Sequence, residues 1–67
     1  MSATNIAEKL VELRGEKTRE EVAKAVGVSL SAIQMYENGM RIPRDEVKMA
    51  LARYYGVSVG NLFFDQE

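Results

Sequence analysis

Residues 18–39 read TREEVAKAVGVSLSAIQMYENG, and they decide the fold. Thr18 can cap a helix together with Glu21, because its hydroxyl accepts one free backbone N–H while the carboxylate accepts another. A helix is therefore expected over residues 19–26. Gly27 follows at the position where a chain leaving a helix often needs a positive φ. This part of the sequence predicts a short capped helix that ends in a tight turn.

A second helix is expected directly after that turn. Ser29 is a favourable N-cap for a helix over residues 30–38, and Gly39 marks its end. Ile33 and Tyr36 fall on the inward face of this helix. Two short helices joined by a tight turn form a helix-turn-helix, which most often serves to read nucleic acid.

Three further helices are predicted outside residues 18–39. Apolar residues at intervals of four and three indicate a first helix over residues 4–14. Pro43 is expected in the first turn of a fourth helix that ends at Gly56. Ser58 can cap a last short helix with Leu62 inward. The inner faces of the first, second and fourth helices are predicted at Ile6, Leu10, Leu13, Val22, Ala23, Val26, Val47, Leu51, Ala52 and Tyr55.

The chain resembles a known family over most of its length. Residues 18–43 look like the Cro/repressor-type helix-turn-helix domain, the XRE family, with TREEVAKAVGVS as second helix and turn and SLSAIQMYENG as third helix and exit. Residues 47–63, VKMALARYYGVSVGNLF, are similar to the last two helices of that family. The resemblance implies an all-α, compact five-helix repressor-like domain. It also implies that the protein is a transcriptional repressor that binds double-stranded DNA sequence-specifically at a palindromic operator. Residues 30–38 would then lie in the major groove.

The sequence departs from the family in the link after the first helix. Only Gly15-Glu16-Lys17 separate Arg14 from Thr18, which is shorter than is usual in the family, and Lys17 replaces an apolar residue. The first helix is therefore free to dock differently. In many relatives an arginine near this place pairs with the glutamate of an ENG segment, which suggests an ion pair between Arg14 and Glu37. The alternative is that the two are unrelated surface charges.

Composition bounds the class of protein. The chain has 67 residues, 46% of them hydrophobic, which is enough for one small core, so a single domain over residues 1–67 is expected. It contains no cysteine and no histidine, and we find no Gly-rich phosphate loop, so we expect no enzyme, cofactor, metal or small-molecule ligand. The sequence shows neither an apolar run of membrane-spanning length nor a signal peptide. We therefore expect a soluble, cytoplasmic protein.

One face of the recognition helix carries the candidate base-reading residues. Gln34 can pair with adenine through two hydrogen bonds, and Ser31 can donate or accept one. Leu30 and Met35 offer only apolar contacts, such as one with a thymine methyl group. The alternatives are solvated helix surface for the polar side chains and local packing for the apolar ones. The predicted base-reading residues are Leu30, Ser31, Gln34, Met35 and Asn38.

Basic side chains gather around the motif. Arg19 lies where the family usually has a glutamine that touches a phosphate, and Arg41 and Arg44 flank the same surface. Residues 17–44 hold five basic and three acidic side chains, whereas the rest of the chain holds four basic and seven acidic ones. The alternative is an ordinary mixed-charge surface, because the chain as a whole carries a net charge of −1. The predicted phosphate-binding residues are Thr18, Arg19, Ser29, Arg41 and Arg44.

A homodimer joined through its C-terminal end is also expected. Two modules on half-sites about one helical turn apart combine their DNA contacts. Phe63 and Phe64 are adjacent and are not expected to enter the same small core together, so at least one ring is predicted to meet a partner. The alternative is that both rings fold back over Leu62 and the fourth helix. The predicted interface residues are Tyr54, Val59, Phe63 and Phe64.

A second class of function fits the same fold. The apolar side chains of Leu30 and Met35 would also suit a protein-interaction module, such as an antitoxin-like domain that holds a peptide or another regulator. Steep salt dependence of binding to duplex DNA separates the two interpretations.

Overall fold

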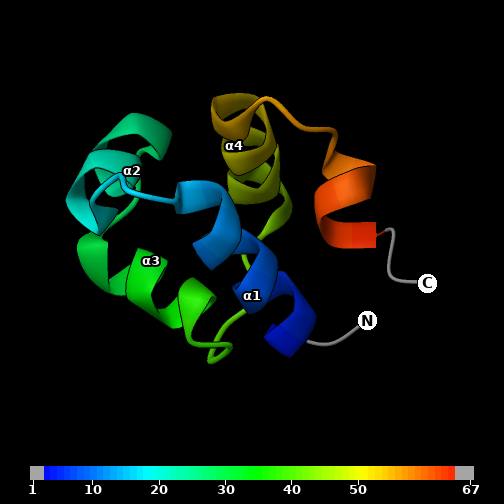
Figure 1. Ribbon diagram of the computed structural model, residues 1–67, viewed down its shortest axis with the longest axis horizontal. Helices are drawn as coiled ribbons and strands as arrows, with labels where there is room; N and C mark the ends of the chain where they lie inside the picture. Colours follow the sequence, from blue (N-terminus) through cyan, green and yellow to red (C-terminus); the bar gives the residue numbers. More distant parts are fainter. Residues whose placement is uncertain (1–2, 65–67) are drawn as a thin grey trace.

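The computed structural model describes residues 3–64, and the side chains of residues 5–63. These residues form four α-helices followed by a short π-helical turn, with no strand among them (Figure 1). The helices are α1 (Ala3–Arg14), α2 (Arg19–Val26), α3 (Leu30–Glu37) and α4 (Asp45–Tyr55), and the π-helical turn is η1 (Gly60–Phe64). The predicted all-α fold with five helical elements is confirmed.

The predicted caps shape the helix-turn-helix. The Thr18 hydroxyl accepts the backbone N–H of Glu21 at 3.1 Å, and the Glu21 carboxylate accepts the N–H of Thr18 at 3.2 Å. The Ser29 hydroxyl accepts the N–H of Ala32 at 3.1 Å and starts α3. Gly27 has φ +79° and lies in the left-handed region that glycine adopts without steric cost. Both helix starts and the turn between them are thus set by local sequence.

The fourth helix begins later than the sequence indicates. Pro43 was expected in its first turn, but α4 starts at Asp45 with Arg44 as an extended N-cap, so this prediction is wrong. The start at Asp45 places two carboxylates, those of Asp45 and Glu46, in the first turn, where they complement the positive end of the helix dipole. Pro43 is instead buried in the segment between α3 and α4.

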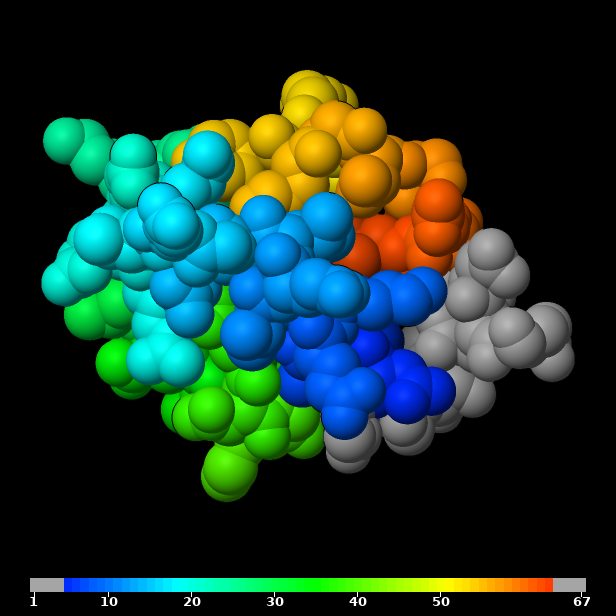
Figure 2. Space-filling view, in the orientation of Figure 1, coloured from blue at the N-terminus to red at the C-terminus, as the bar shows by residue number. Residues whose placement is uncertain are grey.

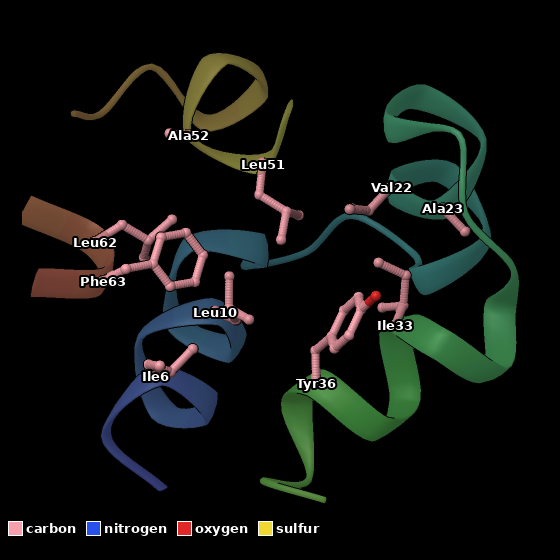
Figure 3. Packing of buried hydrophobic residues seen from close by; sticks show 10 residues of the cluster. All are labelled: Ile6, Leu10, Val22, Ala23, Ile33, Tyr36, Leu51, Ala52, Leu62 and Phe63. Atoms are coloured by element: carbon pink, nitrogen blue, oxygen red, sulfur yellow. The ribbon is translucent and has the colours of Figure 1, made fainter. Parts of the chain in front are cut away.

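All five elements contribute to one core, as Figure 3 shows. The predicted inward residues Ile33 and Tyr36 are buried in it, and α3 packs against both α1 and α2. η1 closes the core beside α1, with the adjacent side chains of Leu62 and Phe63 both buried. The core residues are Ile6, Leu10, Val22, Ala23, Ile33, Tyr36, Leu51, Ala52, Leu62 and Phe63.

This packing positions α3. Its inner side is held by the core, and its N-cap follows directly from the turn after α2, so the outer side of α3 remains on the surface of the molecule. None of the described helices is both long enough and apolar enough to cross a membrane.

Candidate nucleic-acid interface

The outer side of α3 displays the predicted base-reading residues. At 100° per residue, positions 30, 31, 34, 35 and 38 fall within a single arc of the helix. The structure leaves all five exposed, opposite the buried Ile33 and Tyr36. Leu30 and Met35 are among the large hydrophobic side chains exposed to solvent, and neither belongs to the core. The exposed residues of this arc are Leu30, Ser31, Gln34, Met35 and Asn38.

The two capping hydroxyls lie on the surface at the starts of α2 and α3. Thr18 and Ser29 are exposed, and the oxygen of each already accepts a backbone N–H within its own helix. A hydroxyl that accepts in this way can still donate its own O–H. Each predicted phosphate contact at these residues would therefore use that remaining O–H.

Two of the predicted phosphate-binding arginines follow α3 in the chain. Arg41 and Arg44 are exposed in the segment that connects α3 to α4. The backbone N–H of Met40 donates to the carbonyl of Met35 at 2.9 Å, which folds the beginning of this segment back onto the end of α3. Arg41 is therefore carried close to the C-terminal end of α3.

The third arginine, Arg19, belongs to an ionic cluster around a buried carboxylate. The carboxylate of Glu37, the last residue of α3, has only 2% of its side-chain surface exposed. The Nε of Arg14 donates to Glu37 Oε2 at 2.8 Å, so the suggested ion pair between Arg14 and Glu37 is confirmed. The Nε of Arg19 donates to Glu37 Oε1 at 2.9 Å. One carboxylate thus ties the end of α1 and the start of α2 to the end of α3.

The second contact of this cluster was not found from the sequence. Arg19 and Glu37 are 18 positions apart, and only the packing of α2 against α3 brings them together. On the face shown in Figure 2, the residues at the start of α2 (cyan) lie beside α3 (green). The signal available in the sequence is the basic residue at the first position of α2, which the sequence alone predicts only as a phosphate ligand.

The buried carboxylate of Glu37 affects the pKa values of two neighbouring groups, Arg14 and Tyr55. The hydrogen bond from Arg14 to Glu37 raises the pKa of the Arg14 guanidinium above its ordinary value. Burial, with the negative charge of Glu37 as second cause, raises the pKa of the Tyr55 hydroxyl to about 12. At neutral pH Arg14 is therefore positively charged and the Tyr55 hydroxyl is neutral.

The predicted dimer residues divide into different environments. Tyr54 and Val59 are partly exposed, whereas the Phe63 side chain is 0% exposed and fills the core between α1, α4 and η1 (Figure 3). Phe63 therefore has no surface to offer a partner, which corrects its assignment to the interface. The Phe64 side chain lies outside the described residues.

The chain belongs to the helix-turn-helix family of the XRE type, a family of transcriptional regulators, because residues 6–62 match that family. One curated relative is the cryptic phage CTXphi transcriptional repressor RstR of Vibrio cholerae, to which the chain is 38% identical over 61 residues. The match covers 88% of this chain and 55% of the relative, so the chain spans about half the length of that repressor. No solved structure matches the chain significantly.

Proposed function

We propose that this domain binds double-stranded DNA sequence-specifically as a transcriptional repressor, with α3 in the major groove. The observation that carries the proposal is the exposed arc of α3, which a capped turn and the core hold in a fixed orientation. A recognition helix needs this arrangement, because its side chains can reach base edges only if the rest of the domain positions it on the backbone. The related phage protein is itself described as a transcriptional repressor.

Selection of bound sequences from a random duplex pool tests this proposal. We expect one sequence to be enriched, and we expect binding to it to weaken steeply with salt, because phosphate contacts release counterions. Binding that does not depend on duplex sequence would reject specific recognition. The proposal also places the protein in the cytoplasm, where its DNA target would be accessible, and assigns it no catalytic role.

A first prediction concerns the phosphate contact at Arg41. Arg41→Ala is expected to weaken binding to all duplexes alike and to lower the slope of log K against log salt by about 0.9. The matched control is Arg53→Ala, which removes an exposed positive charge from the last turn of α4, outside the motif. Fluorescence anisotropy over a salt series measures both slopes. Equal slopes for wild type and Arg41→Ala would remove Arg41 from the interface.

A second prediction concerns base reading by Gln34. Gln34→Ala is expected to cost about 1–3 kcal/mol of binding on the selected sequence and to relax the preference at one base pair. Folding should be unaffected, because Gln34 is exposed. Glu8→Ala, an exposed position on α1, is the control. A uniform loss of affinity over all sequences would instead assign Gln34 to the DNA backbone.

The protein-interaction alternative has one observation in its favour. Leu30 and Met35 expose apolar surface at the two edges of the proposed interface, where a more polar readout would be expected of a DNA-binding helix. If duplex DNA shows no salt-dependent binding, this surface becomes the candidate site for a peptide or another regulator.

A homodimer on a palindromic operator completes the proposal. Exposed Met49 of α4 lines a surface depression together with Val59, so apolar surface is available near the predicted interface. A single module offers a small DNA interface, and two modules in register add their contacts.

The third prediction tests this dimer. Met49→Ser is expected to shift the protein from dimer to monomer in sedimentation experiments and to reduce binding to paired half-sites more than to a single half-site. The exposed Met40 provides the control, Met40→Ser. A wild type that stays monomeric at high concentration and binds single and paired half-sites equally would overturn the dimer.

A further inference from the structure

The two arginines that share Glu37 are not equivalent. Arg14 has 18% of its side chain exposed, and its Nη1 also donates to the carbonyl of Lys17 at 2.7 Å. Arg19 has 37% of its side chain exposed and contacts Glu37 through Nε. A guanidinium has five N–H donors, four of them on the two terminal nitrogens. Arg14 thus donates to two acceptors within the protein, Glu37 and the carbonyl of Lys17, whereas Arg19 reaches solvent.

The two arginines bring two positive charges to the single carboxylate of Glu37. A buried carboxylate needs one cationic partner to offset its desolvation, and Arg14 supplies it in the more buried position. Arg19 adds a second positive charge that the carboxylate does not need for neutrality. The surplus charge lies at the more exposed guanidinium, at the first residue of α2.

The location of the surplus charge matches the proposed interface. Glu37 is the last residue of α3, the exposed Asn38 follows it, and Arg41 lies shortly beyond. The contact with Glu37 therefore holds Arg19 at the C-terminal end of the recognition helix. A duplex that receives α3 in its major groove brings backbone phosphates to the ends of that helix.

We propose that Glu37 is a positioning residue that holds Arg19 in place to bind a DNA phosphate beside the C-terminal end of α3. This inference rests on the proposed function and deepens it. Nε is fixed by the carboxylate, and the terminal N–H groups of Arg19 are left to donate to phosphate oxygens. Because the side chain is ordered before DNA arrives, less rotamer freedom is lost on binding than at a freely moving arginine. Glu37 thus acts on DNA only through Arg19.

The first test measures the order of Arg19 in the free protein. ¹⁵N relaxation of the arginine Nε–H groups by NMR is expected to show Arg19 Nε as rigid as the helix backbone. The exposed Arg53 serves as the internal reference for a mobile side chain. An Arg19 Nε as mobile as that of Arg53 would overturn the positioning role.

The second test measures DNA binding of Arg19 variants on the selected duplex. Arg19→Gln retains an N–H donor for Glu37 but no charge, and it is expected to lower the slope of log K against log salt by about 0.9. Arg19→Lys restores the charge and is expected to recover the slope. The affinity of Arg19→Lys should stay about threefold to tenfold below wild type. Lysine has a single side-chain nitrogen, whereas arginine can contact Glu37 through Nε and a phosphate through its terminal nitrogens. Circular dichroism confirms that each variant is folded.

The outcomes separate this inference from the proposed function. A wild type that binds no duplex in a salt-dependent way would reject the proposed function and this inference with it. If wild type binds and Arg19→Gln shows the same affinity and slope, only the phosphate contact at Arg19 fails. Full recovery of affinity in Arg19→Lys would show that the hold by Glu37 is not needed.

Discussion

Replacement of Glu37 by glutamine is expected to lower the free energy of unfolding by about 3 kcal/mol, the low end of the range for removing one partner of a buried ion pair, because Arg14 and Arg19 remain partly exposed. The Glu37 side chain is 2% exposed, and each of its carboxylate oxygens accepts a guanidinium N–H. An amide can accept with its oxygen, but its NH₂ group would face the other arginine, donor against donor. The variant therefore leaves one of the two partly exposed arginines, Arg14 or Arg19, without its carboxylate acceptor.

The size of this loss is large for so small a domain. At about 0.05–0.15 kcal/mol per residue, a chain of 67 residues is stabilised by roughly 3–10 kcal/mol in total. The loss expected for Glu37→Gln is consequently a large fraction of the total stability. Urea titration followed by circular dichroism measures the change, with the exposed Glu12→Gln of α1 as control. A denaturation midpoint equal to that of the control would mean that the cluster contributes little to stability.

The second large effect is expected at Phe63. Its ring is 0% exposed among Leu10 of α1, Leu51 of α4 and Leu62 of η1 (Figure 3). The Lys48 ammonium lies 5.5 Å from the ring centroid, a cation–π arrangement. Phe63→Ala removes this burial and leaves a cavity, which typically costs about 3–5 kcal/mol.

Urea titration of Phe63→Ala tests whether η1 is an integral part of the domain. The control is Met40→Ala, which truncates an exposed side chain and should change stability by less than about 0.5 kcal/mol. If the core closes over η1 as the structure shows, Phe63→Ala loses cooperative unfolding or shifts to a much lower midpoint. A loss of less than about 1 kcal/mol in the free energy of unfolding would indicate that the first four helices fold without η1.

These stability effects are distinct from the effects predicted at the DNA interface. Gln34 and Arg41 are exposed and hold no core contact, so their variants should remain as stable as wild type while binding changes. Arg19 belongs to both groups, because it contacts the buried Glu37 and also reaches the surface. Its variants therefore need a folding control before any loss of binding is interpreted.

The sequence by itself determined the features that depend on neighbours along the chain. A cap needs a hydroxyl and backbone groups three positions away, as at Thr18 and Ser29. A left-handed turn needs a residue without Cβ, as at Gly27. The buried face of a helix follows from the 3.6-residue period, which correctly placed Ile33 and Tyr36 inside. The exposure of the arc of α3 that is proposed to read bases follows from the same period.

Tertiary structure decided what depends on segments far apart in the chain. The contact of Arg19 with Glu37 exists because α2 packs against α3, and no local pattern encodes it. Whether Phe63 faced the core or a partner was likewise settled by the space that α1 and α4 leave for η1. Propensity, capping and periodicity act over a few residues, whereas burial and ion pairing are shared between helices whose approach the sequence pattern does not specify.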